Sequence, residues 1–184
     1  MAGGSATHAG IGFQDQVTGL VSVHVLADAP VDFFGLPSGV TPISIELETS
    51  APVDDILVGT SATGFCFINV KKGVTTSTKS DSPLASVVDQ FVRLWIACQS
   101  GRSTRSWQRP LEVSKDRVVL VTGGGRSTTF TAALSKVLGR IDDRASIARD
   151  AVTSTEPERA AYDAVVQLLR LAFHRHTGTE GSND

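Results

Sequence analysis

The sequence has few cysteines and no long hydrophobic run, and each shortage excludes a class of protein. Cys66 and Cys98 are the two cysteines among its 184 residues, and they lie too far apart for the CxxC spacing of a metal or redox site. We expect both thiols to be buried as small hydrophobic side chains. No apolar run reaches the roughly 18 residues that a membrane span needs. The chain is therefore predicted to be water-soluble and to have no membrane partner.

The sequence also has little excess charge of either sign. Its 17 Lys and Arg residues and 19 Asp and Glu residues give a formal net charge of −2 at pH 7. This balance argues against a general polyanion binder, although a nearly neutral protein can carry a local basic surface. Residues 1–10 lack the positive start and apolar stretch of a signal peptide, and they do not form an amphipathic transit peptide. We expect the protein to stay in the cytoplasm.

Composition divides the chain into three parts. Residues 1–10 are rich in Gly, Ala and Ser and are expected to be disordered. Residues 11–176 are long enough to form one domain with its own hydrophobic core. Residues 177–184 are small and polar, and we expect them to form a tail or a linker to a further domain.

Hydrophobic periodicity predicts helices and strands in the order α-β-β-β-α-β-α-α. A Ser-Pro pair at residues 82 and 83 is a strong helix start. The uninterrupted apolar run 118–121 predicts a strand buried on both faces. The expected helices cover residues 13–26, 83–99 and 128–140 and a last segment from 157; the expected strands cover residues 43–47, 55–58, 65–70 and 118–121. The fold class is therefore α/β.

The hairpin of the second and third expected strands carries the most informative polar residues. Because side chains alternate along a strand, Asn69 and Lys71 project from one face and the residue between them projects from the other. Lysine is rarely buried without a partner. Asp55 on the neighbouring strand, with Asp54 beside it, is positioned by sequence to be that partner and to offer oxygen ligands to a divalent ion.

A helix followed by a hairpin that bears an Asp and then a polar-x-Lys triplet resembles the PD-(D/E)xK nuclease superfamily, which has the restriction-endonuclease-like fold. The resemblance covers roughly residues 10–95. More narrowly, four segments are similar to the double-stranded-DNA nuclease domains at the N-terminus of bacterial anti-phage effectors. These are residues 10–14 (Gly-Ile-Gly-Phe-Gln), 53–56 (Val-Asp-Asp-Ile), 67–71 (Phe-Ile-Asn-Val-Lys) and 118–122 (Val-Val-Leu-Val-Thr).

This resemblance implies a mixed β-sheet core flanked by helices and a Mg²⁺-dependent endonuclease acting on double-stranded DNA, with Mn²⁺ able to replace Mg²⁺. It further implies a defence effector that works as a homo-oligomer or with a fused or associated sensor module. The implied metal ligands are Asp55, Asp54 and Asn69, with Glu46 or Glu48 as a further carboxylate. The implied catalytic residues are Asp55, Asn69, Lys71 and the helix-borne Gln14. Asn69 departs from the family pattern, because it stands where a Glu or Gln is usual.

Basic residues around and after the hairpin are candidates for contacts with DNA phosphates. Lys and Arg that neutralise phosphates make binding fall steeply with salt. An ordinary solvated loop explains the same residues equally well. The candidates are Lys72, Lys79, Arg102, Arg105 and Arg109.

Two alternatives remain open at this point. Asn69 removes one negative metal ligand, so the chain can instead be a catalytically inactive nuclease-fold domain that serves DNA binding or protein assembly. Residues 122–128 (Thr-Gly-Gly-Gly-Arg-Ser-Thr) lie between a strand and a helix and suggest a nucleotide-binding regulatory domain. They match no complete phosphate-loop template, which favours a tight strand-to-helix turn there.

Overall fold

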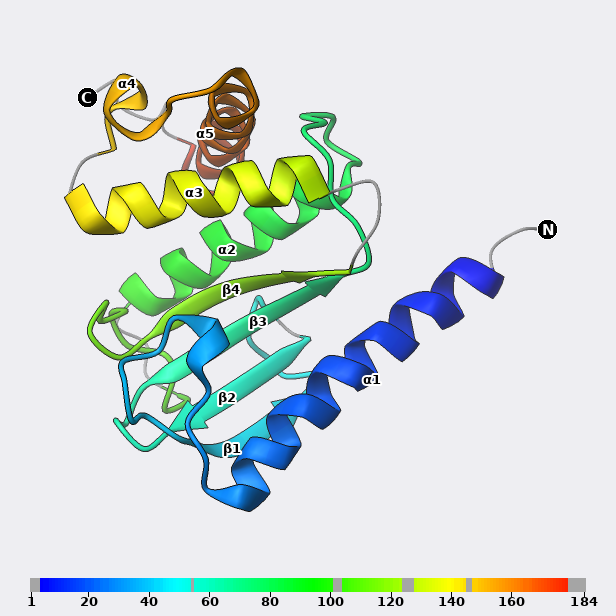
Figure 1. Cartoon of the computed structure of the whole chain (residues 1–184), viewed down its shortest axis with the longest axis vertical. Helices are drawn as coiled ribbons and strands as arrows, with labels where there is room; N and C mark the ends of the chain where they lie inside the picture. The colour runs from blue at the N-terminus through cyan, green and yellow to red at the C-terminus, as the bar shows by residue number, and fades with distance from the viewer. Residues whose placement is uncertain (1–3, 54, 101–103, 124–127, 145–146, 179–184) are drawn as a thin grey trace. The chain divides into compact units, whose positions relative to one another are not determined.

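The structure is a computed structural model that describes the chain except for residues 1–3, 54, 101–103, 124–127, 145–146 and 179–184 (Figure 1). Asp54, Arg102 and most of the expected glycine turn therefore lie outside the described residues. The elements follow in the order α1 (Gly4–Ala27), the 3-10 helix η1 (Asp32–Phe34), β1 (Pro42–Leu47), β2 (Ile56–Thr60), β3 (Phe65–Lys71), α2 (Pro83–Gln99), β4 (Arg117–Thr122), α3 (Thr128–Arg144), α4 (Arg149–Val152) and α5 (Glu156–Thr177).

The expected α/β order is confirmed, with η1 and α4 as short additions. Helix α2 begins at Pro83, as the Ser-Pro pair predicts, and the hydroxyl of Ser82 accepts the N–H of Ala85 at 3.2 Å. Helix α1 differs from the prediction, because it begins at Gly4 and includes residues 4–10, which were expected to be disordered. No proline precedes Pro30, and alanine supports a longer helix.

The chain divides into two compact units. The first consists of Met1–Lys72 and Arg93–Val121, and the second of Gly73–Val92 and Thr122–Asp184. The first unit contains α1, the hairpin strands and nearly all of β4. The second unit contains α3, α4 and α5, and helix α2 runs from the second unit into the first.

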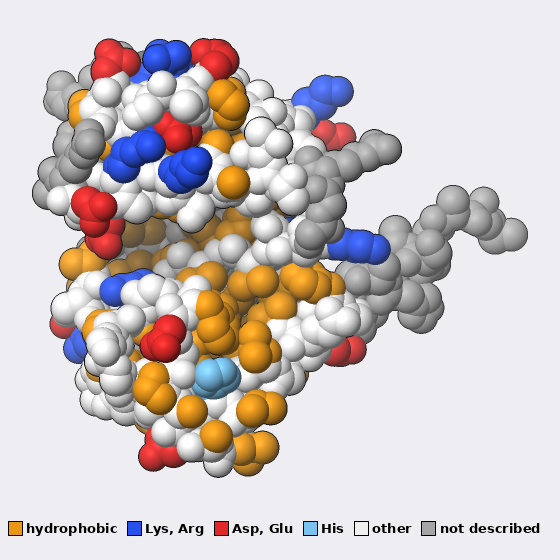
Figure 2. All heavy atoms as spheres, in the orientation of Figure 1, with side chains coloured by type: hydrophobic (Ala, Val, Ile, Leu, Met, Phe, Trp, Pro, Cys, Tyr) orange, Lys and Arg blue, Asp and Glu red, His pale blue; other side chains and the backbone are white. Residues whose placement is uncertain are grey.

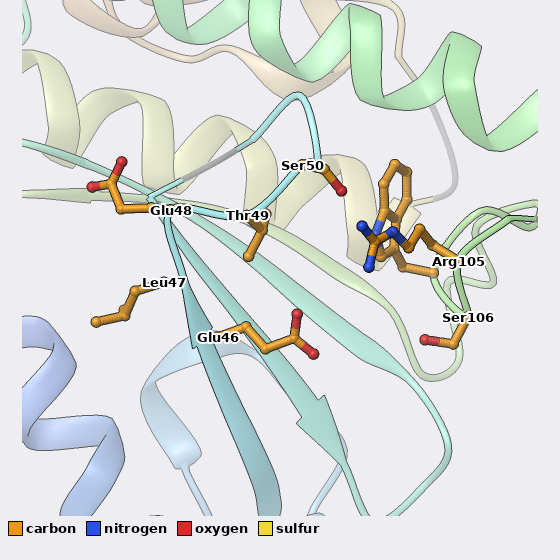
Figure 3. A pocket seen from close by; sticks show the side chains of 8 residues that line it. Glu46, Leu47, Glu48, Thr49, Ser50, Arg105 and Ser106 are labelled. Atoms are coloured by element: carbon orange, nitrogen blue, oxygen red, sulfur yellow. The ribbon is translucent and has the colours of Figure 1, made fainter.

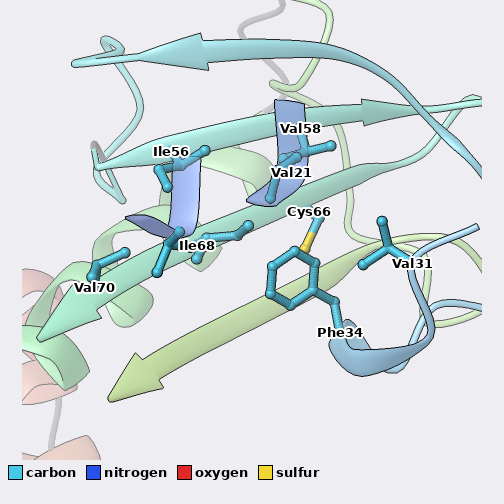
Figure 4. Close-up of a cluster of buried hydrophobic side chains, with 9 residues drawn as sticks. Val21, Val31, Phe34, Ile56, Val58, Cys66, Ile68 and Val70 are labelled. Atoms are coloured by element: carbon cyan, nitrogen blue, oxygen red, sulfur yellow. The ribbon is translucent and has the colours of Figure 1, made fainter. Parts of the chain in front are cut away.

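The sheet has the strand order β1-β2-β3-β4. Strands β1, β2 and β3 pair antiparallel, with Ile45 opposite Val58 and Ile56 opposite Ile68. Strand β4 lies beside β3 and runs in the same direction, which makes the sheet mixed (Figure 4). The fold class is thus α/β with a mixed sheet.

Strand β4 is not buried on both faces, which corrects the prediction for residues 118–121. Val118 is 37% exposed, and the other five residues of the strand are only partly buried. The apolar run does form a strand. Its place at an end of the described sheet leaves it less covered than a central strand.

The core of the first unit lies between α1 and one face of the sheet. Val17 and Val21 of α1 pack with alternate residues of β2 and β3, and Val31 and Phe34 close the cluster (Figure 4). The strand residues in this cluster are Ile56, Val58, Cys66, Ile68 and Val70. Because strand side chains alternate, Asp55, Asn69 and Lys71 belong to the opposite face.

In the second unit, α3 packs against α5 and an ion pair joins them. The guanidinium of Arg140 donates to Glu158 at 2.7 Å and to the carbonyl of Val152 at 3.0 Å. Glu158 also accepts the N–H groups of Ser154 and Thr155, completing a capping box at the start of α5. One carboxylate therefore ties the start of α5 to α3.

Several large apolar side chains of α1 are exposed, among them Leu20, Val23 and Leu26. Figure 2 shows hydrophobic side chains gathered over the C-terminal part of α1 and η1. None of the described helices is both long and apolar enough to span a membrane.

Candidate functional site

The structure brings Asp55 and Lys71 together across the β2–β3 hairpin. The ammonium Nζ of Lys71 lies 3.7 Å from Oδ2 of Asp55, and the two side chains are 28% and 18% exposed. The same oxygen accepts the backbone N–H of Val70 at 2.7 Å. The carboxylate is thus tied to the strand that carries the lysine, while both charged groups keep access to solvent.

Asn69 lies on the same sheet face as Lys71 and is fully buried. The register pairs Ile56 with Ile68 and Leu57 with Phe67. Continuing it by one residue places Asp55 opposite Asn69. An acid, an amide and an ammonium group therefore occupy one end of the hairpin on one face.

Gln14 reaches this end of the hairpin from α1. Its side-chain amide donates to the main-chain carbonyl of Asp55 at 3.3 Å. Gln14 therefore contacts the backbone of Asp55, not the carboxylate, and its contact fixes the position of the loop before β2.

A pocket of about 300 Å³ lies on this sheet face of the first unit (Figure 3). Glu46 pairs with Leu57 across β1 and β2, so its side chain projects on the same face as Asp55. The pocket is lined by Glu46, Leu47, Glu48, Thr49, Ser50, Arg105, Ser106 and Trp107.

The expected basic residues have different environments. Lys72 and Lys79 are exposed, the first in one unit and the second in the other. Arg105 is exposed and lines the pocket. Arg109 instead binds Asp116 through two hydrogen bonds, of 2.6 and 2.9 Å, and stacks over the ring of Phe65. Arg109 therefore has a structural role that the sequence did not reveal.

Asp116 is a buried carboxylate that the sequence analysis missed. Burial raises the pKa of this group, but hydrogen bonds from Arg109 and from the N–H groups of Glu112 and Phe65 outweigh burial and hold the pKa below its usual value. Asp116 thus stays ionised and connects the segment before β4 to β3. The sequence signal is an Asp that precedes an apolar run by one intervening residue, Arg117, and it is equally typical of an exposed strand end.

Both cysteines are buried, as predicted. Burial raises the pKa of Cys66 to about 12. Burial, with the nearby Asp116 carboxylate, also raises the pKa of Cys98. A thiol is nucleophilic as the thiolate, so neither residue is suited to nucleophilic catalysis.

A divalent cation at the hairpin end would need water and phosphate oxygens to complete its coordination. In the described ranges no three His, Cys, Asp or Glu side chains form a ligand group. Asp55 supplies one carboxylate, and its Oδ1 makes no hydrogen bond to a described residue. Magnesium is commonly held by one or two carboxylates plus water and phosphate oxygens. Asp55 and the amide of Asn69 are therefore the residues that would hold it.

No protein-family model, curated protein or solved structure matches the chain in the comparisons with known proteins. The geometry of these side chains is therefore the guide to function.

Proposed function

We propose that this chain is a metal-dependent DNA endonuclease domain with a PD-(D/E)xK-type site formed by Asp55, Asn69 and Lys71. The observation that carries the proposal is the 3.7 Å approach of Lys71 to Asp55 on adjacent strands, beside a buried amide. The further expectation is that the domain works as the effector part of an anti-phage system, as a homo-oligomer or with a sensor module.

The side chains of this site would each have a separate role in phosphodiester hydrolysis. When bound at Asp55 and Asn69, Mg²⁺ would polarise the scissile phosphate and make a water more nucleophilic. Lys71 offers a positive charge to the negative charge that develops on the phosphate oxygens. Gln14 holds the main chain of Asp55, and the N–H of Val70 orients its carboxylate.

A second function, DNA binding or protein assembly without cleavage, is favoured by one observation. Asn69 is neutral and fully buried, so Asp55 supplies the single negative charge of the proposed Asp55, Asn69 and Lys71 site. A single negative ligand binds Mg²⁺ less strongly than two. The two functions differ in whether DNA is cut or only retained.

The test is cleavage of linear duplex DNA with Mg²⁺, with Mn²⁺ and with EDTA. We expect cutting with either metal and none in EDTA. Lys71→Ala should lower the rate by about 10²- to 10³-fold, because it removes one electrostatic contact to the transition state. Lys136→Ala is the matched control, since it removes the same charge from an exposed position on α3.

Two results would contradict the endonuclease proposal. One is DNA retention without cutting under every metal condition, which supports the second function. The other is a Lys71→Ala protein that cuts at the rate of the unsubstituted chain, which removes the lysine from the mechanism.

A further inference from the structure

We propose that the pocket beside the hairpin binds an unpaired guanine base, with Glu46 and Arg105 reading its two polar edges. This inference rests on the proposed nuclease function, because it assigns the pocket to a nucleotide of the DNA substrate. It concerns residues outside the Asp55, Asn69 and Lys71 site.

The charged groups of the pocket do not satisfy one another. Among the described residues, the guanidinium of Arg105 and the carboxylates of Glu46 and Glu48 take part in no ion pair or side-chain hydrogen bond. Figure 3 shows the carboxylate of Glu46 and the side chain of Arg105 directed toward the same space, while Leu47 points away. A ligand with both donor and acceptor groups would satisfy them.

Guanine is the base whose pattern fits this pair best. Its O6 and N7 atoms are adjacent acceptors that an Arg fork binds with two hydrogen bonds. Its N1–H and N2–H groups are adjacent donors that one carboxylate accepts together. The other bases lack two adjacent donors beside two adjacent acceptors. Because base pairing occupies the N1 and N2 groups, the pocket requires a guanine that is unpaired or flipped out of the helix.

The pocket is held in shape by the segment that carries Arg105. The side-chain carbonyl of Gln108 accepts the N–H groups of Thr104 and Arg105, at 3.0 and 3.1 Å. Trp107 packs edge-on against Phe67 of β3, with ring centroids 6.2 Å apart. Both contacts lie within the first unit, so Arg105 starts from a fixed backbone position. A volume of about 300 Å³ lies at the lower end of small-ligand pockets.

The pocket and the hairpin site share one face of the sheet. Glu46 pairs with Leu57, which is two residues along β2 from Asp55 and therefore projects on the same side. A nucleotide held at Glu46 and a phosphate held near Lys71 would therefore lie on the same face of the sheet. Under this proposal, the pocket selects which linkage is cut.

The first experiment measures binding without cleavage. Calorimetric titration in EDTA compares 5′-GMP with AMP, CMP and TMP. We expect GMP to bind at least tenfold more tightly than the others, since one bidentate pair discriminates by about 10- to 100-fold. Glu46→Gln and Arg105→Ala should each remove that preference. Glu156→Gln and Arg159→Ala make the same charge changes on exposed side chains of α5 and should leave it intact.

The second experiment maps cut sites on random duplexes with single-stranded overhangs in Mg²⁺. We expect a guanine at a fixed distance from the cuts made by the unsubstituted chain, and no guanine preference at the cuts that Glu46→Gln still makes. Equal binding of the four nucleotides, or no binding of GMP, would overturn the guanine assignment even if DNA is cut. Selective GMP binding with no cleavage would keep the guanine site and overturn the nuclease function. Binding of free GMP with cuts that ignore guanine would also overturn the assignment to the substrate strand.

Discussion

The backbone N–H of Val70 donates a 2.7 Å hydrogen bond to the carboxylate of Asp55. This bond fixes the acid to β3 independently of the neighbouring lysine side chain. Removing the Lys71 ammonium therefore leaves Asp55 in place. A loss of cleavage in Lys71→Ala can then be assigned to the missing charge and not to a displaced ligand.

Replacing Asn69 with aspartate should make folding depend on divalent cations. The substitution places a second carboxylate in a fully buried position beside Asp55, where like charges and desolvation oppose ionisation. We expect Asn69→Asp to lower the thermal unfolding midpoint when EDTA is present. Adding Mg²⁺ or Mn²⁺ should raise the midpoint again, because a ligand that binds the folded state stabilises it. The measurement is thermal unfolding with and without each metal, with Asn69→Ala as the control that cannot gain a ligand. A midpoint insensitive to metal in Asn69→Asp would contradict a cation site here.

Removing the guanidinium of Arg109 should lower the free energy of unfolding of the first unit. The loss in the free energy of DNA binding should be smaller. Arg109→Ala leaves the buried carboxylate of Asp116 without its bidentate partner, and we expect a loss of about 3 kcal/mol in the free energy of unfolding. Arg109→Lys keeps the charge but not the two parallel hydrogen bonds, so its loss should be intermediate. Urea unfolding checks both values. Unchanged stability with reduced DNA affinity would show that Arg109 binds phosphate instead.

Exposed Lys72 should contribute to DNA affinity through salt-dependent binding. If it contacts one phosphate, Lys72→Ala should reduce the slope of log K against log salt by about 0.9. The measurement is DNA binding in EDTA over a series of salt concentrations. Lys136→Ala on α3 provides the control, and equal slopes for the two variants would exclude the contact.

The second unit should lose stability in acid through Glu158. Hydrogen bonds from Arg140 and from the Ser154 N–H hold the pKa of Glu158 at about 2, below its ordinary 4.5. The unfolded chain thus takes up this proton at a higher pH than the folded chain. The stabilisation is complete above about pH 4.5 and is lost as the pH falls toward 2.

The test of this pH dependence compares thermal unfolding of the unsubstituted chain and Glu158→Gln from neutral pH down to about pH 2. The unsubstituted chain should be the more stable at neutral pH, and the gap should narrow as the pH falls. A gap of constant size across the range would show that ionisation of Glu158 does not stabilise the fold.

Gly64 should tolerate no side chain, because the backbone of another segment approaches it. A Cβ at this position would overlap the carbonyl oxygen of Lys115. We expect Gly64→Ala to lower the free energy of unfolding by about 1–3 kcal/mol. Gly139→Ala on α3 is the control, since nothing lies within 4 Å of its added Cβ, and it should stabilise by about 0.5–1 kcal/mol. Urea unfolding that ranks the two variants in the opposite order would contradict this packing.

The sequence predicted the elements whose signal is local. The Ser-Pro pair marked the start of α2, and alternation placed Asn69 and Lys71 on one face of β3. The carboxylate partner of Lys71 was predictable for the same reason, because a short hairpin leaves few registers. The predicted length of α1 was wrong, because the weak compositional signals near the start of the helix did not reveal where it begins.

Other features depend on residues that are distant in the chain. Glu46 and Arg105 line one pocket only because β1 pairs with β2 while Trp107 packs on β3. Likewise, the partial exposure of β4 follows from its position in the strand order and not from its apolar residues. Side-chain alternation and the Ser-Pro start of α2 are set by neighbouring residues, so the sequence alone determined the order of the main elements and the polar face of the hairpin. Burial, charge pairing and pockets depend on which segments meet after folding, and only the tertiary structure decided them.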